Sequence, residues 1–122
     1  MTDPVPAGGA WSVQLALGSV DGSEPDLREL LEIWLRQSPR LICDIRRALE
    51  NDDAEKLLLA AHTLKGSLQI LSAEEACLYA AELEAAGQKR QVLSVASSLP
   101  KLEAELAIMT RLVTAYMNTP RL

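Results

Sequence analysis

The sequence is poor in the residues that support metal, redox and hydrolytic chemistry. Its 122 residues include one histidine, His62, and two cysteines, Cys43 and Cys77. Two cysteines are too few for a disulfide framework, so we expect both to be reduced thiols in a cytoplasmic protein. One histidine and two thiols from different predicted helices make a poor metal-ligand set, and the histidine has no evident partner for a hydrolase triad. These shortages argue against a metal site, a redox centre and a triad hydrolase.

Positive charge and long apolar runs are also scarce. The formal net charge is −5, the basic residues are scattered, and the isoelectric point is near 4.8. This balance argues against nucleic acid or an anionic membrane as a partner. No stretch approaches the ~20 uninterrupted apolar residues that span a bilayer. The start, Met1 to Pro4, lacks the basic segment and apolar core of a secretory signal. We therefore expect a cytoplasmic protein without membrane insertion.

Aromatic residues make up 3% of the chain, and phenylalanine is absent. The core must therefore rely on aliphatic side chains, helped by Trp11, Trp34, Tyr79 and Tyr116. Hydrophobic residues reach 48%, which is enough for one compact domain of this length.

The chain divides into an N-terminal segment and a helical domain. Residues 1–22 are expected to be a tail and a short packing segment, with 1–10 forming a loose tail that contains two prolines and two glycines. The stretch 11–17 is predicted to be a short irregular or helical segment laid on the domain, and 20–23 to be a turn. The domain is expected to cover residues 23–118.

Two amphipathic helices are predicted for the first part of the domain. Ser23 can cap the first, whose apolar stripe contains Leu27, Leu30, Leu31, Trp34 and Leu35. Arg28 is expected to face water. Ser38 and Pro39 are typical of a cap followed by proline at the first helical position, so they predict a second helix here. Its stripe contains Leu41, Ile42, Ile45, Ala48 and Leu49.

The next two helices are separated by turn and capping residues. Asn51 to Asp53 are predicted to end the preceding helix, and Asp52 with Glu55 resembles a capping box. The following core positions alternate steps of three and four: Ala54, Leu57, Ala61, Leu64, Leu68 and Leu71. Ser72 with Glu75 predicts a capping box at the start of another helix. Gly87 is predicted to be the residue just past the end of that helix, where glycine is common.

The last apolar series predicts a kinked helix, or two helices in line. It contains Val92, Val95, Leu99, Leu102, Leu106, Met109, Val113 and Tyr116, with Pro100 inside it. Amphipathic helices joined by short loops favour an all-α, antiparallel up-down four-helix bundle with an extra N-terminal segment.

The single histidine has an unusual local setting, Ala61-His62-Thr63-Leu64-Lys65-Gly66-Ser67. His62 lies about 100° round the helix from Ala61 and about 160° from Leu64, so it is off the core seam. Lys65 and Gly66 lie one turn further along its face, and Gln69 lies two turns along. Imidazole titrates near pH 6.5, so one ring nitrogen is mostly free to attack a phosphoryl group, and the Lys65 ammonium can stabilise the product.

Gly66 strengthens this interpretation. Glycine within a helix costs about 1 kcal/mol against alanine, and here it clears bulk beside His62. The hydroxyls of Thr63 and Ser67 can add hydrogen bonds. A lone helical histidine is more often an incidental surface residue, and Gly66-Ser67 could end a helix. The apolar period continues to Leu68, however, so the combination favours a phosphoryl site.

The segment from Ala61 to Ser67 resembles the signature of histidine-containing phosphotransfer (HPt) domains. The resemblance covers about residues 24–115 and includes the first helix near Trp34, the short acidic loop at 51–52, and the Leu83-Glu84 pair. It implies a helical bundle in which His62 is phosphorylated through its outer ring nitrogen. It also implies that Lys65 contacts the phosphoryl group and that Gly66 leaves room for a partner.

The same resemblance implies a response-regulator receiver domain as the partner, supplying its own aspartate and Mg²⁺, so that this chain binds no cofactor. The chain could be free-standing or part of a hybrid sensor kinase, and we expect a monomer. No glycine-rich nucleotide loop is present, which favours a phosphocarrier over an enzyme. The partner is expected on the face of His62, Lys65 and Gln69, with Leu58 and Leu59 as apolar contacts.

Two positions differ from the family pattern. Ser72 stands where glycine is common, and we expect it to cap the next helix. Glu84 stands where some relatives have glutamine near the imidazole. Its carboxylate could orient the inner ring nitrogen, or it could be a solvated charge at a helix edge, and the sequence leaves both open. The alternative function is a helical docking module that binds a signalling partner without phosphorylation.

Overall fold

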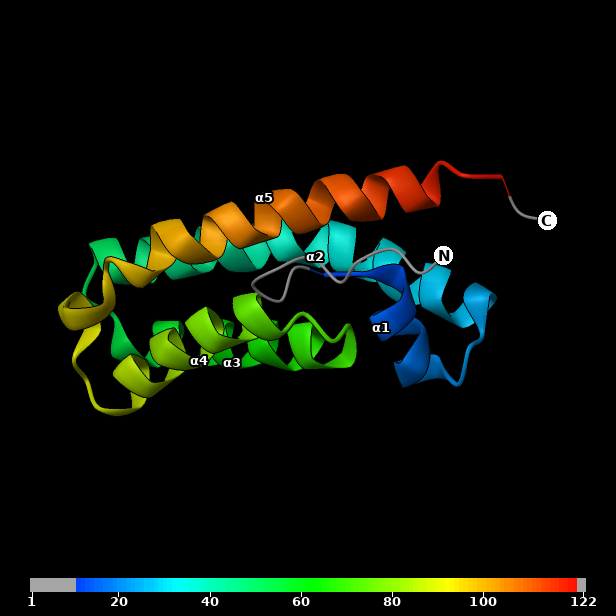
Figure 1. Cartoon of the computed structure of the whole chain (residues 1–122). Coiled ribbons are helices and arrows are strands. Elements are labelled where there is room, and N and C mark those ends of the chain that lie inside the picture. The colour runs from blue at the N-terminus through cyan, green and yellow to red at the C-terminus, as the bar shows by residue number, and fades with distance from the viewer. Residues whose placement is uncertain (1–10, 121–122) are drawn as a thin grey trace.

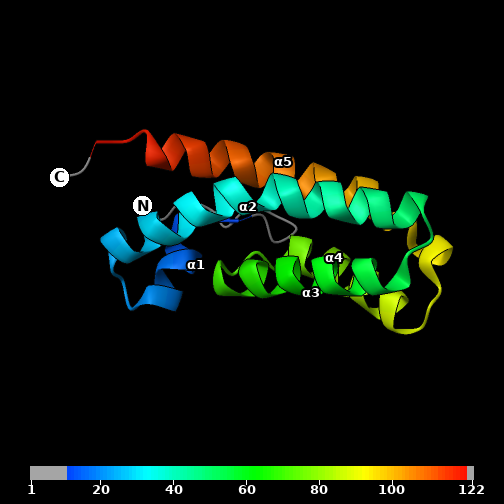
Figure 2. The ribbon, with the colours of Figure 1, turned by 180° about the vertical axis from the view of Figure 1, so that it is seen from behind.

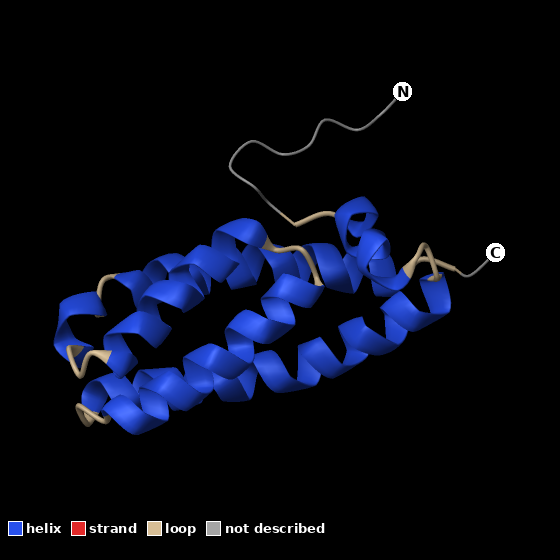
Figure 3. Ribbon diagram, turned by 90° about the horizontal axis from the view of Figure 1, so that it is seen from below, coloured by secondary structure: helices blue, strands red, loops and turns tan. Residues whose placement is uncertain are grey.

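The structure is a computed structural model that describes residues 11–120, and all its regular elements are helical (Figure 3). In chain order they are α1 (Val13–Leu17), the 3₁₀ turn η1 (Gly18–Val20), α2 (Glu24–Glu50), α3 (Ala54–Ile70), α4 (Glu74–Gln88), the 3₁₀ turn η2 (Val92–Val95) and α5 (Ser98–Met117). The loose tail predicted for residues 1–10 lies outside the described residues.

The four long helices run alternately up and down. In Figures 1 and 2, α2 and α5 form one layer, and α3 and α4 form the other. Their apolar faces meet in a single core of mostly leucine and alanine. The predicted all-α, antiparallel four-helix bundle is therefore confirmed. Among the residues that the structure describes, no helix combines the length and apolar character that crossing a bilayer requires.

The N-terminal segment packs on the bundle as a short helix, as predicted for residues 11–17. The Ser12 hydroxyl accepts a hydrogen bond from the Leu15 amide and so caps α1. Trp11 and Ala16 are buried in the common core. The turn predicted at 20–23 is present, with left-handed backbone at Asp21 and Gly22.

α2 is one helix of 27 residues, so the predicted break at Ser38-Pro39 is wrong. Pro39 lies inside the helix, where it removes one backbone hydrogen bond. The core stripe nevertheless continues through it without a change of phase: Leu27, Leu31, Trp34, Ser38, Ile45 and Ala48 are all buried. Packing on both sides of the proline therefore outweighs the local cost, which is about 3 kcal/mol for proline in a helix interior.

The cap of α3 lies one residue later than predicted. The Asp53 side chain accepts a hydrogen bond from the Lys56 amide, whereas Asp52 has a left-handed backbone with φ of 51°. The Asp53 amide donates back to the Ala48 carbonyl at 2.8 Å. This is the hydrogen bond that closes a Schellman motif, in which Asp52 is the residue just past the end of α2.

Ser72 closes α3 in the same way, so its predicted role as a cap of α4 is wrong. Its φ is 58°, and the next amide, of Ala73, bonds back to the Leu68 carbonyl at 2.9 Å. Ala73 is the residue that precedes α4, and it makes no side-chain capping bond. The left-handed conformation at Ser72 gives a physical reason for glycine at this position, because glycine adopts it without strain.

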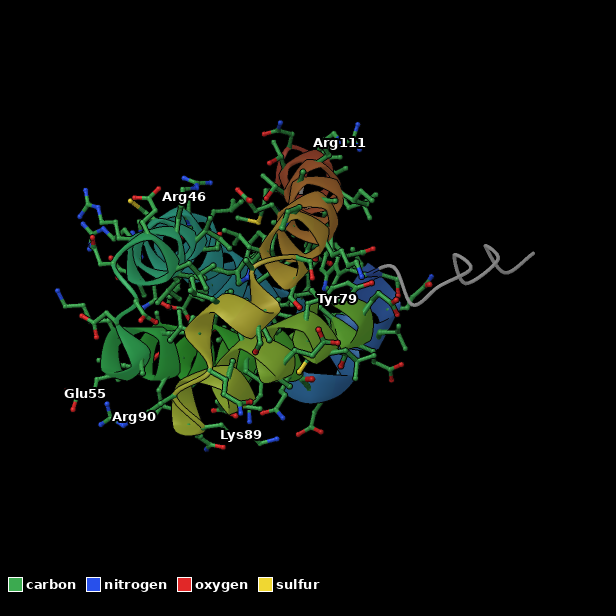
Figure 4. The ribbon with its side chains drawn as sticks, turned by 90° about the vertical axis from the view of Figure 1, so that its left-hand side faces the viewer. Arg46, Glu55, Tyr79, Lys89, Arg90 and Arg111 are labelled. Atoms are coloured by element: carbon green, nitrogen blue, oxygen red, sulfur yellow. The ribbon has the colours of Figure 1, made fainter. Side chains whose placement is uncertain are left out.

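Gly87 does not end α4, as the sequence had suggested, but lies within it. A Cβ atom on Gly87 would lie 2.8 Å from the amide nitrogen and 2.9 Å from the Cα of Leu58. The glycine therefore allows the backbones of α3 and α4 to approach closely. α4 ends at Gln88, and Arg90 takes the left-handed position with φ of 56°. Figure 4 shows Arg90 beside Glu55 at this end of the bundle, with 3.8 Å between the charged atoms.

The prediction here was a kinked helix or two helices in line. The apolar series is instead divided between the short 3₁₀ turn η2 and the single helix α5, so the kinked helix is wrong. Pro100 lies in the first turn of α5, where a backbone N–H has no partner within the helix, and no kink is needed. The apolar positions themselves were predicted well, because Val92, Leu102 and Val113 are all buried.

Candidate functional site

His62 lies in the middle of α3 and points away from the core. Its side chain is 68% exposed, whereas its neighbour Ala61 and Leu64, two residues on, are fully buried. The position off the core seam is what the 3.6-residue period predicts. One ring nitrogen is consequently accessible to a second molecule.

Glu84 comes from α4 and connects His62 with Lys65. One carboxylate oxygen, Oε2, contacts Nδ1 of His62, and the other, Oε1, accepts a hydrogen bond from Lys65 Nζ at 2.5 Å. Glu84 is only 8% exposed. This arrangement excludes the interpretation of Glu84 as a solvated charge at a helix edge. Its carboxylate instead orients the inner ring nitrogen.

The electrostatics keep this carboxylate ionised. The hydrogen bond from Lys65 lowers the pKa of Glu84 below its usual value, and the contact with His62 acts in the same direction, against the effect of burial. An ionised carboxylate can only accept, so the Nδ1 atom of His62 carries the proton. The lone pair of the neutral ring is then on Nε2, the outer nitrogen.

The surface next to His62 is open at Gly66. A Cβ atom placed on Gly66 would meet no other atom within 4 Å, so nothing within the described fold requires glycine there. Thr63 Oγ1 donates to the Leu59 carbonyl at 2.9 Å, and Ser67 Oγ donates to the Thr63 carbonyl at 3.3 Å. These two hydroxyl protons are engaged by the helix itself. The prediction that they bond an incoming group remains a prediction.

The remaining predicted contact residues are not equivalent. Leu59 is 69% exposed and Gln69 is exposed, whereas Leu58 is half-buried. Leu58 lies on the side of α3 that meets Gly87 of α4. Of the two leucines, Leu59 is thus the one that offers its side chain to a partner.

Comparison with known proteins identifies the family. The sequence matches the family described as "Hpt domain" over residues 29–113. The chain belongs to the Hpt domain family. The crystal structure of histidine-containing phosphotransfer protein B (HptB) from Pseudomonas aeruginosa PAO1 is similar to this one, with a TM-score of 0.83 and 22% sequence identity over 95% of this chain and 100% of that chain. At this identity the likeness shows the shared fold. No curated protein matches the sequence.

Other titratable groups of this Hpt domain lie near the site without joining it. Burial raises the pKa of the Cys77 thiol, so the thiol stays neutral, and Sγ lies 3.9 Å from the Lys65 carbonyl. Both cysteines are free. Within residues 11–120, no group of three or more potential metal ligands is present. The expectation that the chain binds no cofactor remains a prediction.

One feature of the Hpt domain was not predicted from the sequence, a groove between α2 and α3 with a volume of about 470 Å³. Its walls are formed by Leu41, Asp44, Arg47, Ala48, Asn51, Asp53, Lys56, Leu59, Ala60 and Thr63. The sequence contains no local signal for it, because its walls come from two helices and the loop that joins them, and the relative placement of the helices depends on tertiary packing.

Proposed function

We propose that this Hpt domain is a phosphocarrier of a phosphorelay that accepts and donates a phosphoryl group at His62. The partner is a response-regulator receiver domain, free or part of a hybrid sensor kinase. The observation that supports this most strongly is the pairing of an exposed imidazole with a buried carboxylate. Glu84 holds the Nδ1 proton of His62, which leaves the lone pair on the exposed Nε2.

The transfer is a single exchange of bonds. The Nε2 lone pair of His62 attacks the phosphorus of an aspartyl phosphate on the receiver domain. An N–P bond forms, the P–O bond to the aspartate breaks, and the aspartate leaves as a carboxylate. The Nδ1 proton stays on the ring, where Glu84 balances the positive charge of the phosphorylated imidazole. The reverse exchange passes the group on, so the domain carries a phosphoryl group and is not a kinase.

Lys65 and Gly66 have separate roles in this proposal. Glu84 holds the Lys65 ammonium with one oxygen and contacts the His62 ring with the other, and in this proposal the ammonium stabilises the added phosphoryl oxygens. Gly66 leaves the surface free of a side chain where the partner must approach. A docking-only module would need neither a fixed ring nor a buried charge next to it, so the Glu84 arrangement supports the phosphocarrier over that alternative.

The test is phosphotransfer from ³²P-labelled receiver domains to the wild-type protein and to His62→Gln. Glutamine keeps the approximate size and polarity of histidine but has no nucleophilic nitrogen. We expect label that is labile to acid and stable to alkali on the wild type only. Label on the folded His62→Gln protein would place the reaction at another residue. No label on the wild type from any of several receiver domains would favour the docking module.

A further inference from the structure

Another cavity lies between α4, η2 and the start of α5. Its volume is about 440 Å³, which is in the range of sites for small molecules. Viewed along α4, Glu82 and Lys89 in its wall lie about 160° and about 140° round the helix from Glu84. The wall contains neither His62 nor Lys65. This α4–α5 cavity is therefore separate from the candidate phosphoryl site.

The wall of the α4–α5 cavity is mainly polar. Seven of its ten lining residues have polar side chains, whereas most small-molecule sites are lined mainly by apolar ones. Gln91 and Ser97 immediately precede η2 and α5, and neither side chain makes a capping hydrogen bond. Both can therefore donate to a ligand. A wall of this composition favours a small hydrophilic ligand over an apolar one.

The wall also carries a net positive charge. Lys89 on α4 and Lys101 on α5 contribute two ammonium groups, and Glu82 contributes one carboxylate, so the formal charge of the lining residues is +1. Within residues 11–120, neither lysine forms an ion pair with Glu82 or with any other carboxylate. Glu82 instead accepts a hydrogen bond at 2.7 Å from the hydroxyl of the buried Ser98. This local charge is opposite in sign to the net charge of −5 for the whole chain.

We infer that the α4–α5 cavity binds a small anion whose carboxylate or phosphate oxygens contact Lys89 and Lys101. Ammonium groups that have no partner in the protein form charge-assisted hydrogen bonds with such oxygens. Ser97 and Gln91 donate further hydrogen bonds to the same ligand. This inference goes beyond the proposed function, because it uses no residue of the phosphoryl site and binding can be measured without a receiver domain.

The first test is an NMR titration of the ¹⁵N-labelled wild-type protein with succinate, inorganic phosphate and butanediol at constant ionic strength. Butanediol has the carbon chain of succinate without its charges. We expect saturable shifts from at least one anion at the backbone amides of Gln91, Ser97 and Ser98, and none from butanediol. Tighter binding of succinate would identify a carboxylate ligand, and tighter binding of phosphate would identify a phosphate ligand. No saturable shift from either anion, or equal shifts from butanediol, would overturn the inference.

Charge variants test the same contacts in opposite directions. Lys89→Gln and Lys101→Gln each remove one ammonium group from the wall. Glu82→Gln removes the carboxylate but keeps an oxygen that can accept from Ser98. Because these three charged side chains belong to exposed residues, we expect each lysine variant to weaken anion binding about threefold or more, and Glu82→Gln to strengthen it about twofold. Lys56→Gln on α3 is the matched control, since it changes the net charge equally outside the cavity.

The comparison with Lys56→Gln decides between a site and a general response to charge. Equal anion affinities for Lys56→Gln and the two cavity lysine variants would overturn the inference, because binding would then follow net charge alone. Weaker binding by folded Glu82→Gln would contradict the assigned role of the carboxylate. Circular dichroism checks the fold of each variant. Failure of the wild type to accept a phosphoryl group at His62 would overturn the proposed function and leave this inference in place.

Discussion

At the scale of single residues, Glu84 determines how the site works. The sequence could place Lys65 near His62, because residues three apart share a helix face. It could not choose between the two interpretations of Glu84, because that choice depends on how α4 packs against α3. The structure decides it: the carboxylate is buried and contacts both His62 and Lys65. A buried carboxylate with two partners has consequences for transfer and for stability.

Phosphotransfer should depend on the hydrogen bond from His62 to Glu84 more than on the charge of Glu84. In Glu84→Ala the ring loses its orienting acceptor, and we expect the rate of transfer to His62 to fall about tenfold or more. Glu84→Gln retains an acceptor oxygen and should recover most of this loss. The measurement is single-turnover transfer from a receiver domain, at several pH values. Equal rates for Glu84→Ala and the wild type would contradict a positioning role.

The pair of Glu84 and Lys65 should also make stability depend on pH. Since the hydrogen bond from Lys65 lowers the pKa of folded Glu84 below its usual 4.5, the folded protein releases this proton more readily than the unfolded chain. The resulting stabilisation is fully present above pH 4.5 and is lost as the pH falls through the lower, folded-state pKa. Urea unfolding at several pH values should show the wild type losing its advantage over Glu84→Gln in that acidic range. An advantage that grows on acidification would mean the sign is wrong.

At the scale of helices, the sequence predicted the helical faces well and the helix ends less well. Every predicted core position of α3 is buried, because the apolar period reports which face meets the core. Three of the misplaced ends share one cause. Asp52, Ser72 and Arg90 adopt left-handed backbone just past a helix, where serine and aspartate patterns suggested caps or where Gly87 suggested a stop. Closure by a left-handed residue leaves little trace in the sequence when that residue is not glycine.

Two helical glycines should respond in opposite ways to alanine. Intrinsic helix propensity favours alanine by about 1 kcal/mol at both positions. At Gly66 the added methyl group meets open space, so we expect Gly66→Ala to stabilise the fold by up to about 1 kcal/mol and to slow transfer from a protein partner. At Gly87 the methyl group would lie 2.8 Å from the Leu58 backbone. We therefore expect Gly87→Ala to destabilise the fold by about 1–3 kcal/mol.

Chemical denaturation of the two glycine variants measures both effects. The contrast is the useful quantity, since each variant is the other's control for helix propensity. A stabilised Gly87→Ala protein would mean that α3 and α4 do not approach as closely as described. A destabilised Gly66→Ala protein would mean that this glycine has a structural role.

At the scale of the whole molecule, the bundle was predictable from periodicity and loop length, but a contact between the start of α2 and the end of α5, which are far apart in the sequence, was not. Arg28 was expected to face water, and it is 5% exposed. Its guanidinium donates to carbonyl groups at the end of α5, at 3.3 Å from Met117 and 3.2 Å from Thr119, and it lies over the Tyr116 ring. A charged residue in an amphipathic pattern is predicted to be exposed unless the carbonyl groups that accept its hydrogen bonds are known.

Removing Arg28 should therefore cost more than removing an ordinary surface arginine. We expect Arg28→Ala to lower the free energy of unfolding by about 3 kcal/mol, because several carbonyl groups lose the charged donor that the buried Arg28 side chain supplies. Arg28→Lys should recover only part of this, since lysine lacks the planar fork of donors. Arg111→Ala is the control, with an expected change within about 0.5 kcal/mol. Equal urea midpoints for Arg28→Ala and Arg111→Ala would contradict the contact.

The most direct test of the central claim is to locate the phosphoryl group on the ring of His62 by NMR. Because His62 is the only histidine, ¹⁵N-labelled imidazole gives one set of ring signals. After transfer from a phosphorylated receiver domain, we predict phosphorus coupling at Nε2 and a proton retained at Nδ1, the atom that Glu84 contacts. Coupling at Nδ1, or a phosphorylated protein with an unmodified imidazole, would contradict the account.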